Sequence, residues 1–137
     1  AFIELSVGLG TFRPIEANDI SHHSMHEEEY RITPTVWTAC QEAERVVAIG
    51  TTVVRALETA AVTKALEGKS DLFITPGFEF KIVDALLTNF HQPRSTLLVM
   101  IEAFMGEGWR ELYSVALAEG YRFLSFGDAM FLDRQVV

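Results

Sequence analysis

A compact polar block lies between two apolar runs in the second half of the chain, and its residue types suit the binding of a small polar ligand. Because Pro93 disfavours helix at the residue before it, we expect the block to form a loop. Ser95 or Thr96 can cap the helix that follows, and a helix start carries free N–H groups and partial positive charge. Arg94 adds a full charge suited to a carboxylate or a phosphate. A binding loop and a well-hydrogen-bonded connection between core elements both remain open. The block comprises Thr88, Asn89, His91, Gln92, Arg94, Ser95 and Thr96.

Three of the four histidines fall in a second polar block at residues 18–30. If that block is helical, His23 and His26 share a face, as do His22 and His26. With a carboxylate from residues 27–29, they have the residue types of a zinc or iron site. The spacing is not the His-Glu-x-x-His of metalloproteases and no further ligand can be located, so a metal site is the least favoured interpretation. A catalytic base and a solvated acidic helix with incidental histidines fit the pattern equally well.

Gly8 and Gly10 stand two residues apart after an expected strand, and Thr11 follows them. Glycines in this arrangement can bring the backbone close to a ligand. Without a third glycine and a following helix, the pair is weak evidence for a dinucleotide site, and Pro14 prevents an early helix. A tight turn is therefore favoured over a ligand-binding loop.

Gly50, Thr51 and Thr52 join a short, wholly apolar segment, the pattern of a buried parallel strand, to an expected helix. A strand that turns into a helix through such residues can bind an anion or a hydroxyl group. Many ordinary strand–helix junctions have the same composition. Arg55 can contribute to a binding site here, or it can pair with Glu58 three residues further along the helix.

Strands and helices alternate through the middle of the chain, which predicts an α/β fold with a largely parallel or mixed sheet flanked by helices. We expect residues 1–137 to form a single α/β domain, because 137 residues with 49% hydrophobic content are about one domain's worth of chain. The glycine-containing residues 68–70 are expected to be a loop. Expected strands cover residues 2–7, 30–33, 46–49, 71–75, 78–83 and 121–126, and expected helices cover residues 34–44, 53–66, 97–105 and 109–119.

Charge and cysteine content exclude several classes of protein. The formal net charge of −8 argues against an independent nucleic-acid binder, because phosphate contacts need clustered lysine and arginine. The single cysteine, Cys40, excludes an intrachain disulfide and a cysteine-rich zinc site, and it fits a reducing cytoplasm. No apolar run reaches transmembrane length. The first seven residues lack the basic region of a signal peptide, and we expect them to be a strand within a longer protein.

Six short blocks follow one another along nearly the whole chain. They are Val7-Gly-Leu-Gly-Thr-Phe-Arg-Pro14, His23-Ser-Met-His26, Ala48-Ile-Gly-Thr-Thr-Val-Val-Arg-Ala-Leu-Glu58, Asp71-Leu-Phe-Ile-Thr-Pro-Gly-Phe-Glu-Phe-Lys81, Asp84-Ala-Leu-Leu-Thr-Asn-Phe-His91 and Phe123-Leu-Ser-Phe-Gly-Asp-Ala-Met130. Each block alone is weak evidence. All six in this order resemble the C-terminal part of the S-adenosylmethionine:tRNA ribosyltransferase-isomerase family of queuosine biosynthesis.

Four positions depart from the family pattern. Ser6 stands where the family usually has histidine, which removes one possible titrating group, and Thr75 stands where it usually has tyrosine. Gln92 and Arg94 flank a proline where the family usually has leucine and lysine, which keeps the charge but changes its geometry. The resemblance also implies that the family's N-terminal part, including a small β-barrel domain, is missing from this chain.

The resemblance implies an enzyme that moves and isomerises the ribosyl group of S-adenosylmethionine onto an aminomethyl-deazaguanine in the tRNA anticodon. The product is epoxyqueuosine, and adenine and methionine leave. A base must remove the proton next to the sulfonium and the departing adenine must be protonated, both of which suit histidine. S-adenosylmethionine is then a ribosyl-donating substrate, and no metal is required. The implied catalytic candidates are His23, His26, His91, Asp84 and Asp128.

The substrate-binding candidates implied by the resemblance divide by chemistry. Thr51, Thr52 and Asn89 can bind ribose hydroxyls or the methionine end of the donor, and Arg94 can meet a carboxylate or a tRNA phosphate. We also expect His23, His26 and His91 to line one cleft. The full set of binding candidates is Gly8, Gly10, Thr11, Gly50, Thr51, Thr52, Arg55, Asn89, Arg94 and Ser95.

The implied partners are tRNA that carries the modified deazaguanine and the missing N-terminal part of the same protein. A cytoplasmic protein with no membrane partner is expected, and a monomer is favoured. The alternative is a non-catalytic fragment or a diverged paralogue that acts as a binding or structural module. The six blocks favour the enzyme family, whereas the missing half and the acidic charge favour the alternative for the isolated chain.

Overall fold

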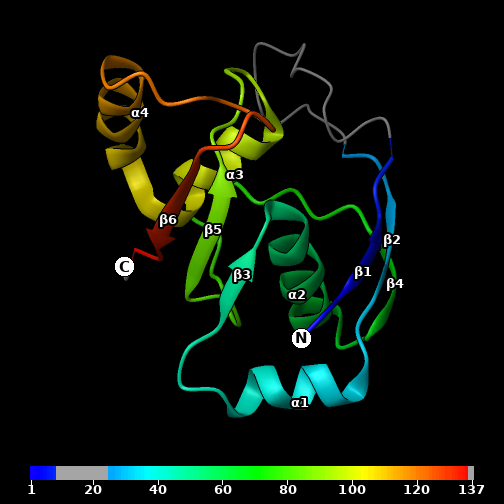
Figure 1. The fold of residues 1–137 in the computed structure, drawn as a ribbon. Helices are drawn as coiled ribbons and strands as arrows, with labels where there is room; N and C mark the ends of the chain where they lie inside the picture. Colours follow the sequence, from blue (N-terminus) through cyan, green and yellow to red (C-terminus); the bar gives the residue numbers. More distant parts are fainter. Residues whose placement is uncertain (9–24, 136–137) are drawn as a thin grey trace.

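The molecule contains two three-stranded sheets with helices around them, in a computed structural model that describes residues 1–8 and 25–135 (Figure 1). The strands are β1 (Glu4–Ser6), β2 (Glu28–Arg31), β3 (Val47–Ile49), β4 (Glu67–Ser70), β5 (Ala85–Asn89) and β6 (Ala129–Asp133), and the helices are α1 (Pro34–Glu42), α2 (Thr51–Thr63), α3 (Thr96–Met105), the 3-10 turn η3 (Gly106–Gly108) and α4 (Trp109–Ala118). One sheet has the order β1-β2-β4, the other has the order β3-β5-β6, and α2 contacts strands of both.

The two sheets differ in strand direction. Both pairings in the β1-β2-β4 sheet are antiparallel, whereas the second sheet pairs β3 parallel to β5 and β5 antiparallel to β6. The expected fold class, a mixed sheet flanked by helices, is therefore confirmed. Within residues 1–8 and 25–135, the only parallel pair is β3 with β5, and each of these two strands leads into a helix.

Side-chain caps mark the starts of α1 and α3. The Thr33 hydroxyl accepts a hydrogen bond from the Val36 N–H, and Pro34 occupies the first turn of α1. The Ser95 hydroxyl accepts from the Leu98 N–H at 3.2 Å and so caps α3, as expected. Both caps fix where the helix begins independently of tertiary packing.

The core lies where α2 and α3 pack against one face of the mixed sheet. Leu57 of α2, Leu86 of β5, and Ile101 and Phe104 of α3 belong to one buried cluster and have almost no exposed surface. Burial of an aliphatic or aromatic side chain of this size contributes about 1.5–3 kcal/mol. This packing holds the starts of α2 and α3 in fixed positions relative to β3 and β5.

Three of the six expected strands are absent, and residues 71–75 and 121–126 account for two of them. Residues 71–75 pair with no strand, although Ile74 is buried in the core. Residues 121–126 form no strand either, because Leu124 has a φ of 61°, which lies outside the extended region. In both segments the apolar pattern reflects burial of individual side chains rather than pairing into a sheet.

The segment at residues 78–83 was expected to be extended, and it forms no strand because its amides bond elsewhere. The buried Glu58 carboxylate accepts the N–H groups of Lys81 at 2.8 Å, Ile82 at 3.0 Å and Val83 at 2.9 Å. The Glu58 carboxylate therefore accepts the amide hydrogen bonds that a neighbouring strand would otherwise accept. Glu58 does not pair with Arg55, which was one interpretation of the sequence.

Three further expectations need correction. Residues 68–70 are part of β4 rather than a loop, because their backbone pairs with β2. Thr88 and Asn89 belong to β5, so the polar loop begins after them. Strand β3 is not buried on both faces: Ala48 is 1% exposed, but Val47 is 46% exposed and Ile49 is 71% exposed.

None of the helices that the structure describes has both the length and the apolar character needed to cross a bilayer.

Candidate functional site

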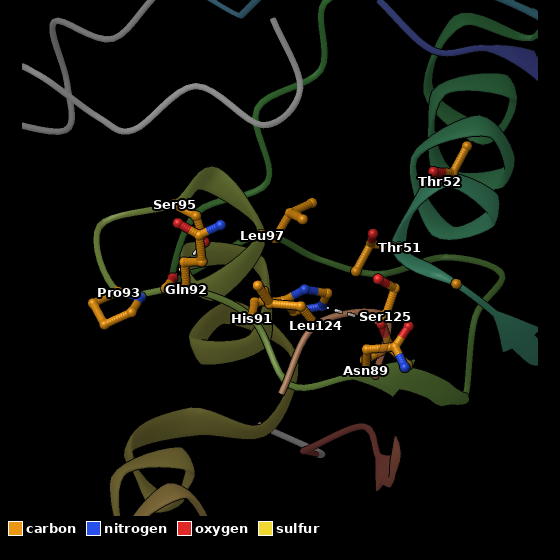
Figure 2. Close-up of a pocket in the computed structure, with 12 residues that line it drawn as sticks. Thr51, Thr52, Asn89, His91, Gln92, Pro93, Ser95, Leu97, Leu124 and Ser125 are labelled. Carbon is orange, nitrogen blue, oxygen red and sulfur yellow. Dashed lines mark hydrogen bonds between the residues drawn. The ribbon is translucent and has the colours of Figure 1, made fainter. Parts of the chain in front are cut away.

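A cavity of about 500 Å³ opens where the parallel strands β3 and β5 end and helices α2 and α3 begin (Figure 2). The carboxyl ends of parallel strands meet at one edge of a sheet, which is where open α/β folds bind ligands. The residues that line it come from both strand–helix junctions and from the segment before β6. They are Gly50, Thr51, Thr52, Thr88, Asn89, His91, Gln92, Pro93, Ser95, Leu97, Leu124 and Ser125.

Gly50 makes the junction between β3 and α2 possible. Its φ is 95°, and its N–H donates to the Leu87 carbonyl of β5 at 2.8 Å. A Cβ at this position would meet no atom within 4 Å, because the residue faces open space. Gly50 supplies no side-chain cap to α2, so the first N–H groups of the helix, on Thr51 and Thr52, lie at the cavity without a side-chain acceptor.

The junction between β5 and α3 is closed by Ser95. Its hydroxyl donates to the Gln92 carbonyl at 2.8 Å and accepts from the Leu98 N–H, so it holds the loop onto the helix start. Arg94, immediately before it, has a φ of 57°, and Leu124, on the cavity wall, has a φ of 61°. Left-handed conformations of such residues are strained and are found preferentially at functional sites.

His91 is held on the cavity wall by two hydrogen bonds. Its Nε2 lies 3.1 Å from the Thr88 hydroxyl, and its backbone N–H donates to the Tyr113 hydroxyl at 2.9 Å. The residue is 8% exposed, and this burial lowers the pKa of its imidazole to about 4. Burial also raises the pKa of the Tyr113 phenol, so both groups are neutral at pH 7.

The cavity wall is polar but carries no formal charge at neutral pH. Among the described residues that line it there is no aspartate, glutamate, lysine or arginine, and its histidine is neutral. Hydroxyl and amide groups alternate with Leu97, Leu124 and Pro93. Such a wall can bind sugar hydroxyls, a flat heterocycle and a single charged group next to the helix starts.

The cavity brings together six of the residues predicted as site residues from two distant parts of the sequence. In Figure 2, Thr51 and Ser125 lie across the cavity from His91 and Ser95. The six are Gly50, Thr51, Thr52, Asn89, His91 and Ser95.

Two predicted acidic residues serve other partners. Asp84 lies at the opposite end of β5 from the cavity, where its carboxylate accepts the Val46 N–H at 2.9 Å and pairs with Arg134 at 3.2 Å. The Asp128 carboxylate bonds to the Arg122 backbone and side chain, which lowers its pKa, and only its backbone carbonyl meets a cavity residue, Asn89, at 3.0 Å.

Arg55 and Gly8 meet at a buried ion pair and do not line the cavity. The Arg55 guanidinium donates to the Glu28 carboxylate at 2.7 Å and to the Ser70 carbonyl at 3.3 Å. The other carboxylate oxygen of Glu28 accepts the Gly8 N–H at 3.2 Å. This pair ties α2 to the antiparallel sheet.

The remaining candidates lie at the surface or outside the described residues. His26 is exposed, and Arg94 is exposed beside the cavity without lining it. His23, Gly10 and Thr11 fall in residues 9–24, which the structure does not describe. The shared cleft for His23, His26 and His91 therefore stays a prediction. No three His, Cys, Asp or Glu residues in the described segments come close enough together to hold a metal ion.

Six lining residues were not predicted as site residues. Thr88, Gln92 and Pro93 lie within or beside the polar block at residues 88–96, so their residue type and position were the available signal. Leu124 and Ser125 come from a segment far along the chain, and only the block at residues 123–130 pointed to it. Leu97 is a buried apolar residue of α3, and its type gave no sign of a ligand site.

Comparison with known proteins gives one consistent result. Residues 1–132 match the family model described as "Queuosine biosynthesis protein". The chain is 55% identical over 133 residues to an S-adenosylmethionine:tRNA ribosyltransferase-isomerase of Rubrobacter xylanophilus, covering 96% of this chain and 40% of the relative. It is 53% identical to the protein of the same name from Moorella thermoacetica, covering 96% of this chain and 41% of the relative.

A solved structure agrees with these sequence matches. The crystal structure of an S-adenosylmethionine tRNA ribosyltransferase from Thermotoga maritima superposes with a TM-score of 0.70 at 47% identity, over 76% of this chain and 40% of that chain. The chain thus spans about 40% of the length of the relatives that it matches.

Proposed function

This chain belongs to the family of queuosine biosynthesis proteins, and from that premise we propose that it supplies part of the active site of an S-adenosylmethionine:tRNA ribosyltransferase-isomerase. The observation that carries the proposal is the cavity. There the start of α2, with Gly50 and Thr51, lies opposite the loop that contains His91, and the two segments belong to separate blocks of the family pattern. The cavity binds the ribosyl donor, S-adenosylmethionine. The acceptor is the aminomethyl-deazaguanine of a tRNA anticodon, and the product is epoxyqueuosine.

The uncharged wall of the cavity supports this choice of ligand. S-adenosylmethionine carries a sulfonium cation, and a site that contained lysine or arginine would repel it. The side chains of Asn89 and Ser125 can bond to the ribose hydroxyls and the adenine edge, and those of Thr51 and Thr52 can bond to the methionine end. Arg94, outside the cavity, has a charge suited to a tRNA phosphate.

His91 is the group in the described cavity that can carry a proton. Its Nε2 is occupied by Thr88, whereas its Nδ1 has no hydrogen-bond partner among the described residues. If Thr88 accepts from Nε2–H, then Nδ1 has a lone pair that can take the proton next to the sulfonium. Burial lowers the pKa of His91 to about 4, which makes its imidazolium a stronger acid and its neutral imidazole a weaker base than usual. Protonation of the departing adenine is therefore the step that this pKa favours.

The partners and location follow from this reaction. The chain works with the remaining part of the full-length protein, whose relatives are about 2.5 times as long because this chain covers 40% of them. The acidic charge of −8 implies that basic surface for tRNA comes from that part. We place the protein in the cytoplasm, as one domain of a monomer, with no membrane partner. No metal takes part in the proposed reaction, because the sulfonium already activates the ribosyl group.

The test uses a full-length protein built by joining this chain to the remaining part of the Rubrobacter xylanophilus relative. Adenine release is measured with S-adenosylmethionine and with tRNA that either carries or lacks the aminomethyl-deazaguanine. The proposal predicts adenine release only when both substrates are present, and none from the 137-residue chain alone. Binding of tRNA by the joined protein without consumption of S-adenosylmethionine would support the alternative, a non-catalytic binding module.

A further inference from the structure

Two helix starts face the same cavity, and they differ in how their N–H groups are satisfied. Ser95 caps α3 through its hydroxyl, whereas Gly50 gives α2 no side-chain cap. Helix α2 is 13 residues long, so its start carries the partial positive charge of a full helix dipole. The start of α2 is therefore the more electropositive of the two ends that meet the cavity.

Thr51, at the first position of α2, has a hydroxyl that lacks a partner. The residue is 7% exposed and lines the cavity, yet its hydroxyl forms no hydrogen bond with any residue that the structure describes. The other buried hydroxyls that line the cavity are bonded: Thr88 to His91 and Ser95 to the Gln92 carbonyl. A buried hydroxyl without a partner costs free energy unless a ligand supplies one.

The chemistry of the missing partner is constrained by its surroundings. A helix start with a free hydroxyl and free N–H groups favours an anionic oxygen. A phosphodiester of RNA is normally bound with lysine or arginine, and the described residues that line the cavity include neither. A carboxylate on a ligand that carries its own positive charge has no such requirement, because the ligand itself supplies the compensating positive charge.

We propose that the uncapped start of α2, with the Thr51 hydroxyl and the Thr51 and Thr52 N–H groups, binds the carboxylate of the amino-acid part of S-adenosylmethionine. This assignment rests on the proposed function and adds to it the orientation of the donor. The methionine end lies at α2, which leaves the ribose and adenine next to His91 and the β5 loop. The sulfonium then lies between the two helix starts, in the uncharged middle of the cavity.

The test compares two donors in the joined full-length protein by isothermal titration calorimetry. S-adenosylmethionine carries the carboxylate, and its decarboxylated analogue differs only in lacking it. We expect the analogue to bind at least tenfold more weakly. Equal affinities for the two donors would overturn the carboxylate assignment while leaving the cavity as the donor site. Failure of both donors to bind would contradict the proposed function itself.

A substitution locates the carboxylate within the cavity. Thr51→Val keeps the shape of the side chain and removes the hydroxyl, and it should weaken S-adenosylmethionine binding about tenfold without changing the affinity for the decarboxylated analogue. Thr38→Val, an exposed position on α1, is the matched control and should change neither affinity. Equal loss for both donors in Thr51→Val would contradict the assignment. Competition by an anticodon stem-loop RNA that disappears in Thr51→Val would assign this end to a phosphate instead.

Discussion

The two ends of strand β5 use their polar residues in opposite ways. At its start, Asp84 has its partners in place, because its carboxylate bonds to the Val46 amide and to Arg134. At its far end, about 17 Å away at the rise of a strand, His91 and the nearby Thr51 each keep an atom without a partner among the described residues. Saturated polar groups stabilise a fold, whereas unsaturated buried ones point to a ligand. Within one sequence block, hydrogen-bond saturation therefore separates a residue whose side chain is bonded within the fold, Asp84, from a candidate for ligand binding, His91.

The largest expected effect is on turnover at the cavity end. His91→Ala in the joined full-length protein removes the proposed proton carrier and should lower adenine release by about 10²–10⁴-fold. Asp84→Asn is the matched control, because it changes the other end of the same strand and should leave turnover within a few-fold of wild type. A comparable loss in Asp84→Asn, or unchanged turnover in His91→Ala, would break the distinction between the two ends.

The next largest effect is on the free energy of unfolding, at the segment that leads into the start of β5. Glu58→Ala leaves the N–H groups of Lys81, Ile82 and Val83 without their acceptor in a buried position. We expect the free energy of unfolding to fall by about 3–4 kcal/mol, measured by urea denaturation of the chain. Glu58→Gln keeps two acceptor lone pairs and should lose less. A loss below about 1 kcal/mol in Glu58→Ala would show that the segment is held by other contacts.

A smaller effect concerns pH. The folded protein lowers the pKa of His91 from 6.5 to about 4, so the unfolded chain binds the extra proton between these values. His91 therefore destabilises the fold as pH falls from about 6.5 towards 4, by about 2 kcal/mol at pH 5. His91→Gln removes this contribution, so the difference in unfolding free energy between wild type and variant should change by that amount between pH 7 and pH 5. A difference that is constant with pH would show that His91 titrates normally.

The sequence predicted the strand–helix junctions well because their signals are local. Ser95 is a capping residue with a direct physical role, and it caps the helix expected of it. Gly50 marks a turn that needs positive φ, and the junction that it makes opens on the cavity. These residues act through atoms within a few positions of themselves, so periodicity and residue type were sufficient.

The failures come from partners that lie far along the chain. Arg55 was predicted to bind a ligand, but in the structure its guanidinium pairs with Glu28, 27 residues away in the sequence. Asp84 was predicted to be catalytic, but its carboxylate pairs with Arg134. Apolar residues 71–75 resembled a strand, but strand pairing went to the polar residues of β4. Neither Leu124 nor Ser125 carries a local signal that places it opposite His91. The charge and polarity of a residue alone do not predict whether its side chain will find hydrogen-bond or ion-pair partners within the fold.

The most direct test of the central claim is a crystal structure of the joined full-length protein with S-adenosylmethionine. We predict that the donor occupies the cavity between the starts of α2 and α3, with its amino-acid end at Thr51 and its ribose beside His91. Electron density for the donor at another surface, with Thr51 and His91 making no contact to it, would contradict the assignment of this cavity as the site of ribosyl transfer.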